Sequence, residues 1–522
     1  MKQININEPD YSGFKVMLVY ANSPMDNLFP VSVSSIAGAL KDSGFDLRLF
    51  DTTYYPNAVD DAGGGERKDT LQVAEFDYAE VGIEFKLTDM FDDFRKAVID
   101  FSPDLIALST VEPTHLKGIR LLSNVRDLKI QTIVGGVFSI FDPEYSISAP
   151  EVDMVCIGEG ETTMVDLCKR MAKGVPYDDV KNLWIKHGEK IIKNEKSELE
   201  DLDDLPVLDF SVFEEKRVFR PMSGKMYRMA PIEFSRGCMY KCTYCSAPGF
   251  EQEFADQGDW LRNKSMTKIM EEIRFYVDEY GIDYFYFISE TFLAMPRKRF
   301  DEFCDEYSKV NLPFWFNTRA ETISPYKISR LEEIGCHRMS IGVEAGNEEY
   351  RRNMLQRPVS TKKTIESCNM VSESSIELSV NNVIGFPDET RDMIFETIEL
   401  NRAILADSFS CCIFQPYRGT ELLKYSVRKG YYDDSRLAMD VTVDSVLNQP
   451  HITKEEIRGL EKTFQLYVKL PKERWGDIYK IETNQPGSDA LFEELKGEFL
   501  KIDSKSKVDP REASAGFHFQ TK

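Results

Sequence analysis

The sequence predicts an α/β protein in which a doubly wound parallel sheet is followed by a partial (β/α)6 barrel and a mostly helical C-terminal region. Two observations support this. Short apolar runs rich in β-formers alternate with amphipathic runs of helical spacing, the pattern of a parallel sheet covered on both faces. The alternation also occurs in two separate series, on either side of an acidic, proline-marked stretch. We therefore expect two α/β domains joined by a linker.

The composition limits the classes of protein to consider. The 522 residues are enough for about two to four domains. The 65 basic and 88 acidic residues give a net charge of −23, which argues against a broad surface for nucleic acid or anionic membranes. No secretory signal core and no run of ~18 apolar residues is present, so we expect no membrane span and a cytoplasmic location. The ten cysteines are then reduced.

The first domain is predicted over residues 1–174. Its five strand-like runs are 15–21, 46–52, 104–110, 131–136 and 153–158. Ligands of a doubly wound sheet bind beyond the carboxyl ends of the strands. The insert with Gly63, Gly64 and Gly65 is expected to be a surface excursion. It is not a phosphate loop, because no Lys-Ser/Thr pair follows in register.

Residues 175–230 are predicted to form a linker, with a hairpin that turns at His187 and Gly188. The second alternation then fills a barrel over residues 231–430. Its six strand-like runs are 231–236, 284–290, 313–319, 338–346, 377–386 and 410–417. Barrel enzymes place their chemistry on the loops after the strands. Residues 431–522 are expected to be helical, to cover the barrel mouth and to end in a frayed tail.

Three cysteines, Cys238, Cys242 and Cys245, directly follow the first barrel strand. Thiolates select zinc or iron–sulfur centres. A structural zinc site normally has four protein ligands, and a [4Fe–4S] cluster is usually bound by four cysteines. The next cysteine in the sequence, however, is the distant Cys304. One iron would therefore stay open, as a catalytic centre requires. A zinc ion completed by a distant residue is the alternative.

This loop resembles that of the radical S-adenosylmethionine (SAM) enzymes. The resemblance implies that the three cysteines bind a [4Fe–4S] cluster whose open iron chelates SAM, and that an electron from the cluster cleaves SAM to a 5′-deoxyadenosyl radical. It also implies anaerobic chemistry and a reductant of the flavodoxin or ferredoxin type. Tyr244 matches the family's aromatic residue near the adenine.

Polar residues at later strand ends match the family's SAM contacts in order. Glu290 is expected at the SAM amino group, because a carboxylate accepts charge-assisted hydrogen bonds from an ammonium group. Arg319 is expected to bind the SAM carboxylate or Glu344, which follows the fourth strand.

The fifth strand is expected to serve the SAM ribose. Ser379 and Asn381 are assigned to its hydroxyls, and Gly385 to a close backbone approach. Arg418 stands where related proteins often carry proline, which puts the local turn in doubt.

The first domain resembles the cobalamin-binding domain that precedes the barrel in one large subfamily, and the resemblance covers about residues 15–430. It implies that the double glycine lets the backbone approach the corrin ring, and that polar residues after the third and fifth strands hold its polar rim. The residues assigned to cobalamin are Ser109, Thr110, Glu112, Gly135, Gly136, Gly158, Glu159 and Glu161.

The histidine that ligates cobalt in mutase-type cobalamin domains is missing. We therefore expect base-off cobalamin without a histidine ligand. His115 is the nearest imidazole, and we expect it at the surface. Phe138 replaces a histidine seen in many related proteins, which predicts an apolar lower face.

Three hypotheses for function follow. The first is a methyltransferase that acts on an unactivated carbon through the 5′-deoxyadenosyl radical. The second is a non-methylating cyclase or oxidoreductase with the same cofactors. The third is a non-catalytic cobalamin sensor, against which the intact cysteine loop argues. A small molecule, a lipid and a peptide all remain open as substrates, and no substrate-contacting catalytic residue is assigned.

Overall fold

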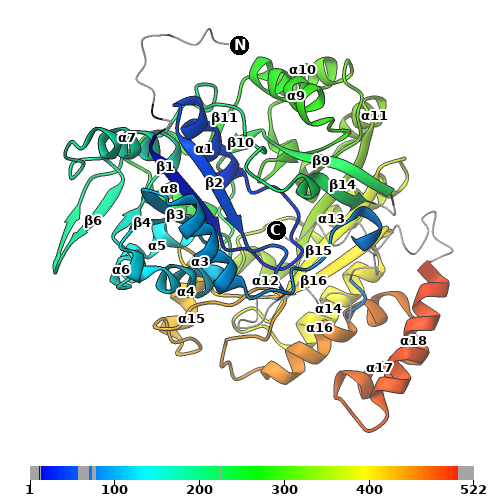
Figure 1. The fold of residues 1–522 in the computed structure, drawn as a ribbon. Helices are drawn as coiled ribbons and strands as arrows, with labels where there is room; N and C mark the ends of the chain where they lie inside the picture. Colours follow the sequence, from blue (N-terminus) through cyan, green and yellow to red (C-terminus); the bar gives the residue numbers. More distant parts are fainter. Residues whose placement is uncertain (1–10, 12, 57–69, 73–77, 223–224, 504–522) are drawn as a thin grey trace.

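The computed structural model describes residues 11, 13–56, 70–72, 78–222 and 225–503. The insert with Gly63, Gly64 and Gly65 and the expected frayed tail lie outside these ranges. Two seven-stranded sheets form the molecule, the first drawn in blue to cyan and the second in green to yellow in Figure 1. In the described part of the chain, no helix is both long and apolar enough to cross a bilayer.

The first sheet has the strand order β2-β1-β3-β4-β5-β6-β7. Its five parallel strands confirm the predicted doubly wound fold: β1 (Lys15–Tyr20), β2 (Asp46–Asp51), β3 (Leu105–Ser109), β4 (Gln131–Gly135) and β5 (Met154–Cys156).

Alternate residues of β1 enter different cores, as the period of two requires. Val16 and Leu18 join the cluster of α1 (Val31–Asp42) and α7 (Gly160–Lys173). Met17 and Val19 join that of α3 (Met90–Phe101) and α4 (His115–Asn124).

The predicted linker contributes strands to both sheets. The expected hairpin consists of β6 (Leu183–His187) and β7 (Lys190–Lys193), with Gly188 at φ +60° in its turn. It pairs antiparallel with β5 and so extends the first sheet. At the other end, β8 (Phe219–Met222) pairs with β9 (Lys225–Glu233) in the second sheet.

The second sheet contains the six parallel strands of the predicted barrel and curls into a half barrel. After β9 come β12 (Tyr284–Ile288), β13 (Phe314–Thr318), β14 (Cys336–Glu344), β15 (Glu377–Ile384) and β16 (Ser408–Ile413). The helices that alternate with them are α9 (Met266–Tyr280), α10 (Arg297–Tyr307), α11 (Pro325–Glu333), α13 (Thr361–Ser372) and α14 (Arg391–Arg402).

Large side chains close the amino end of the barrel. Tyr284, Tyr286 and Trp315 form a buried cluster with Met229, and the Trp315 ring stacks on Tyr286 with centroids 4.1 Å apart. Trp315 donates its indole N–H to Ser340 at 2.8 Å, so its polar atom is satisfied. The carboxyl ends of the strands are therefore the end left for chemistry.

The open edge of β16 is covered by polar side chains rather than by another strand. The Cys411 amide donates to Gln72 Oε1 at 2.8 Å, and Gln465 Nε2 donates to the Phe409 carbonyl at 2.5 Å. Gln72 comes from the insert of the first domain and Gln465 from α16 (Lys454–Lys469). Unpaired edges invite aggregation, so these two amides protect the barrel.

The C-terminal helices are α16, α17 (Trp475–Glu482) and α18 (Ser488–Asp503), shown in orange to red in Figure 1. α16 packs against β16 and α14, along the side of the barrel. The segment before α16 lies closer to the carboxyl ends of the strands, because Ile413 N donates to Val441 O and Gln415 Nε2 donates to Asp444 O. Part of this region therefore lies near the barrel mouth, and α16 reaches it too, because Ile457 lies next to Gly385 at the carboxyl end of β15.

Replacing Gln72 with leucine should lower the free energy of unfolding by about 1–3 kcal/mol, because it removes the hydrogen bonds that Gln72 makes with the Cys411 amide and with Glu461. Denaturant titration followed by circular dichroism measures the change. Gln252→Leu, on an exposed position of α8 (Ala247–Glu253), is the control and should change stability little. Equal stability of the two variants would contradict the role of Gln72 at the edge.

Candidate functional site

The three predicted cluster cysteines lie on one loop between β10 (Ser235–Arg236) and α8. All three are free thiols. Burial raises the pKa of Cys238, and raises that of Cys245 to about 11, so both thiols are protonated until a metal displaces the proton. Gly237 has φ +99°, and a Cβ there would lie 2.5 Å from the Trp260 carbonyl, so only glycine fits before Cys238.

The donor set of this loop fits an iron–sulfur cluster better than a single ion. Within the described ranges, no three His, Cys, Asp or Glu side chains are grouped so that they could hold a metal ion. A [4Fe–4S] cluster is larger than one ion, and its cysteines stand correspondingly further apart than zinc ligands. Three free cysteines on one loop match the three protein ligands of a [4Fe–4S] cluster with one open iron, and a zinc ion completed by a distant residue stays the alternative.

Glu290, which is expected at the SAM amino group, lies beside the cysteine loop, and Gly237 N donates to its Oε1 at 3.3 Å. Its side chain is accessible to solvent but surrounded by protein. This partial removal from water, with a smaller contribution from Glu233, raises the pKa of Glu290 to about 7. A cationic ligand at this position would be favoured by the ionised carboxylate.

Arg319 reaches the cysteine loop but not Glu344. Its Nη1 donates to Cys242 Sγ at 3.0 Å and its Nε to Glu321 Oε1 at 2.7 Å. The expected pair with Glu344 is therefore wrong: Glu344 pairs with Arg357 at 3.5 Å. Contact with the SAM carboxylate remains the other expectation for Arg319.

Sequence reasoning missed Arg357, which lies after α12 (Glu348–Asn353) and not at a strand end. Arg357 also donates to the Tyr244 hydroxyl at 3.1 Å, and the Tyr244 ring packs against Phe386 with centroids 5.6 Å apart. Tyr244 and Glu344 are thus brought together by one buried guanidinium.

The three residues expected at the ribose lie at different positions along β15 and the loop that follows it. Ser379 lies near the amino end of β15, fully buried, and accepts from Arg338 at 2.7 Å, so it is not brought to the SAM site. Asn381 lies further along the same face and accepts from Ser410 at 2.8 Å. Gly385 has φ +79°, and a Cβ there would lie 3.1 Å from Ile457 of α16. The backbone conformation and this close packing therefore explain why the position is a glycine.

A cavity of 330 Å³ lies at the carboxyl edge of the first sheet, between α1 and α7. Its wall is mainly apolar, and Phe250 and Trp260 of the second domain close one side. Six of the eight residues predicted for cobalamin line it: Ser109, Gly135, Gly136, Gly158, Glu159 and Glu161.

Two of these glycines are required by the packing of the protein around them. A Cβ at Gly136, where φ is +104°, would lie 2.3 Å from the Thr110 carbonyl, and one at Gly158 would lie 2.3 Å from the Asn182 side chain. Packing within the protein therefore requires both glycines, and it is the mainly apolar lining that fits a largely apolar ring.

The other two predicted residues do not line the cavity. Thr110 Oγ1 bonds His115 Nδ1 at 3.2 Å. Glu112 accepts from the backbone amides of Arg418 at 2.9 Å and Ala438 at 2.8 Å, and pairs with the Arg418 guanidinium at 3.2 Å. Burial raises the pKa of Glu112 despite these donors. Arg418, the departure from proline, therefore joins the two domains.

The expectation that His115 is a surface residue is wrong. Its side chain is fully buried and packs against Phe138, with ring centroids 4.6 Å apart. Burial lowers the pKa of His115 to about 4, so the imidazole is neutral. Neither His115 nor Phe138 lines the cavity; Val137 and Ile140 do.

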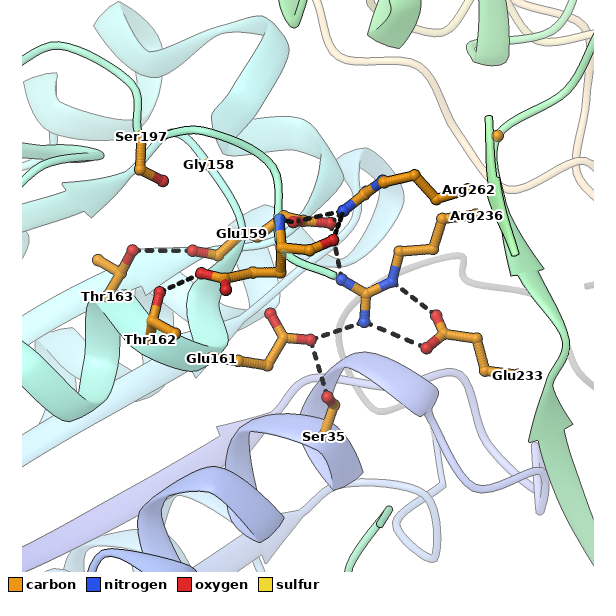
Figure 2. A network of polar contacts seen from close by, with 12 residues as sticks. Ser35, Gly158, Glu159, Glu161, Thr162, Thr163, Ser197, Glu233, Arg236 and Arg262 are labelled. Carbon is orange, nitrogen blue, oxygen red and sulfur yellow. Dashed lines mark hydrogen bonds and ion pairs between the residues drawn. The ribbon is translucent and has the colours of Figure 1, made fainter. Parts of the chain in front are cut away.

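A network of ion pairs joins the cavity wall to the cysteine loop (Figure 2). Arg236 binds Glu159 and Glu161 at 2.7 Å each, and Glu233 at 2.8 Å. Arg262 binds Glu159 at 2.6 Å. Burial opposes ionisation of Glu159, but the two arginines outweigh it and lower its pKa. Arg236 itself lines the cavity and stands two residues before Cys238.

Comparison with known proteins agrees with this geometry. Residues 17–168 match the B12 binding domain, and residues 232–400 match the radical SAM superfamily. The chain belongs to the cobalamin-binding radical SAM proteins. It is a radical SAM enzyme, and the cofactors of this family are cobalamin, SAM and a [4Fe–4S] cluster.

Similar members of the family include enzymes of two kinds. An uncharacterized methyltransferase of Pyrococcus horikoshii is 23% identical, over 75% of this chain and 84% of its own. The anaerobic magnesium-protoporphyrin IX monomethyl ester cyclase of Rubrivivax gelatinosus is 24% identical, over 64% of this chain and 60% of its own. Among solved structures, the radical SAM methyltransferase TsrM of Kitasatospora setae has a similar fold, with a TM-score of 0.60, 14% identity and 80% and 78% of the two chains covered.

Replacing Arg236 with glutamine should lower the free energy of unfolding by roughly 3–5 kcal/mol, because three partly buried carboxylates lose their shared cation. Arg236→Lys keeps the charge and should recover part of the loss. Denaturant titration measures both variants. Arg126→Gln is the control: its ion pair with Asp153 is half exposed and should contribute less than about 1 kcal/mol. A loss for Arg236→Gln as small as for the control would contradict the importance of the network.

Proposed function

We propose that this radical SAM enzyme methylates an unactivated carbon of a small-molecule substrate. One observation carries the proposal: Arg236 lines the cobalamin cavity and stands two residues before the first cluster cysteine. A methyl donor and a source of radicals must both reach one substrate carbon, and this arrangement brings their sites together. The coverage of relatives supports the choice, since the chain spans 84% of the methyltransferase but only 60% of the cyclase.

The chemistry that the chain lacks would come from its cofactors. When bound, the cluster and one SAM would supply a 5′-deoxyadenosyl radical that abstracts a hydrogen atom, and cobalamin would transfer a methyl group that it takes from a second SAM. The protein supplies binding and orientation. Cys238, Cys242 and Cys245 hold three irons of the cluster and leave the fourth for SAM.

For SAM, we assign the amino group to Glu290 and the carboxylate to Arg319, whose Nη2 has no hydrogen-bond partner among the described residues. The adenine lies near Tyr244, which Arg357 holds in place, and the ribose is assigned to Asn381. Ser379 is not included, because it is enclosed at the amino end of β15.

For cobalamin, Gly135 and Gly136 let the backbone approach the ring, and Ser109 offers a hydroxyl to its amide rim. The short helix α5 (Val137–Phe141), which begins directly after Gly136, presents Val137 and Ile140. A side chain of valine or isoleucine cannot ligate cobalt, which supports base-off cobalamin without a histidine on its lower face.

The barrel protects the reaction from water. Its amino end is closed by the aromatic cluster around Trp315, and its open edge by Gln72 and Gln465. A reactive carbon radical survives only where solvent and stray hydrogen donors are excluded. We propose that one electron per SAM cleavage comes from a flavodoxin or ferredoxin.

Anaerobic turnover with SAM that carries a labelled methyl group tests the function. The expected result is a product heavier by one methylene that carries the label, together with 5′-deoxyadenosine. Cys242→Ala should abolish both, with the loss of bound iron, whereas Cys304→Ala, at a buried cysteine in α10, should retain both. A product that has fewer hydrogen atoms than the substrate and carries no label would contradict the methyltransferase proposal and favour a cyclase or oxidoreductase. Absence of SAM cleavage in iron-loaded protein would point to a sensor.

The affinity for SAM should depend on pH through Glu290. Because its pKa is raised from the ordinary 4.5 to about 7, the carboxyl is largely protonated below that pH and charged above it. The ratio of the wild-type to the Glu290→Gln affinity should therefore increase about tenfold from pH 6 to pH 8. Equilibrium dialysis without reductant measures this ratio, in which the titration of SAM itself cancels. A ratio that stays flat would remove Glu290 from the SAM site.

A further inference from the structure

Arg319 makes a contact that SAM binding does not explain. Its Nη1 donates to the sulfur of Cys242 at 3.0 Å, although a free SAM carboxylate would need only the outer face of the guanidinium. Both side chains are buried: Arg319 is 5% exposed and Cys242 is 7% exposed. A charged donor that bonds sulfur in such an environment acts more strongly than it would in water.

The guanidinium is fixed in this position from several sides. Glu321 accepts from its Nε at 2.7 Å. The ring of Tyr240, which lies on the cysteine loop between Cys238 and Cys242, stacks on the guanidinium at 3.8 Å from its centroid. Arg319 is therefore held against the loop before any cofactor binds, so its hydrogen bond to sulfur costs no reorganisation.

The three cluster cysteines differ in their donors. Cys245 Sγ accepts from the backbone amide of Ala247 at 3.5 Å, and Cys238 Sγ lies 4.0 Å from the Thr291 hydroxyl. Within the part of the chain that the structure describes, Cys242 alone accepts from a cationic side chain. The positive charge is thus applied at one corner of the cluster.

We propose that Arg319 is a positioning residue that sets the reduction potential of the cluster through this N–H···S bond. The inference rests on the assignment of Cys242 as a cluster ligand under the proposed function. Reduction transfers one electron from a flavodoxin or ferredoxin to the cluster, with no atom exchanged, and adds negative charge to the sulfurs. A cation and a hydrogen bond at one sulfur stabilise that reduced form and raise the potential.

The test is a potentiometric titration of the reconstituted protein without SAM, followed by electron paramagnetic resonance of the reduced cluster. Arg319→Gln should shift the midpoint to a more negative potential. Arg319→Lys, which keeps the charge without the rigid fork, should fall between that variant and the wild type. A midpoint of Arg319→Gln equal to that of the wild type, with the cluster intact, would overturn the proposal.

Two further variants separate a charge effect from general damage. Glu321→Gln removes the carboxylate that partly neutralises Arg319, so its midpoint should shift in the opposite direction, to a less negative potential. Arg351→Gln removes a fully buried guanidinium of α12 that bonds the Ala345 and Gly346 carbonyls, and it should leave the midpoint unchanged.

The outcomes also separate this inference from the proposed function. If Arg319→Gln fails to take up iron, the midpoints of Glu321→Gln and Arg319→Lys still test the proposal. A Glu321→Gln midpoint that does not become less negative than that of the wild type contradicts it. If wild-type protein shows no [4Fe–4S] signal after reconstitution, the assignment of the cysteines has failed. If it shows the signal and cleaves SAM while all variants share one midpoint, only the role of Arg319 has failed.

Discussion

The guanidinium of Arg236 is the constraint on which the arrangement of the two domains depends. Its partners Glu159 and Glu161 belong to the start of α7, where the helix dipole already favours carboxylates, and its third partner, Glu233, ends β9. With Arg262, two cations face three carboxylates. Short, partly buried ion pairs thus fix the cavity of the first sheet next to the cysteine loop.

The first domain also completes the barrel at places far from Arg236. Leu28, on the loop after β1, packs with the aromatic cluster at the amino end, and Arg217 holds that loop by donating to the Leu28 carbonyl at 2.9 Å. Glu112 forms an ion pair with Arg418 near the carboxyl ends of the barrel strands. A sheet of six parallel strands cannot close on itself, so a neighbouring domain supplies the missing walls. This explains why polar residues of the first domain bond the barrel instead of a ligand.

The sequence was sufficient to predict features that depend on residues close to one another in the chain. The strands follow from alternation, and the cysteine loop from its spacing directly after a strand, because both are local properties of the chain. It failed where a distant element supplies the environment. His115 is a polar residue in a helical pattern, and only the packing of Phe138 and Tyr145 over it reveals its burial. Ser379 has the right residue type on the right strand, but the register pairs it with Ser340 near the other end of the strand, where the Arg338 guanidinium bonds its hydroxyl.

The hydrogen bond between Gln72 and the Cys411 amide spans 339 positions of the chain. During synthesis at about 5–20 residues per second, the insert that carries Gln72 would wait roughly 20–70 seconds for its strand to emerge. The first sheet can fold in that time, but the edge of β16 can be protected only after nearly the whole barrel has been made. The Gln465 side of this strand edge stays uncovered in the nascent chain until α16 has been made as well.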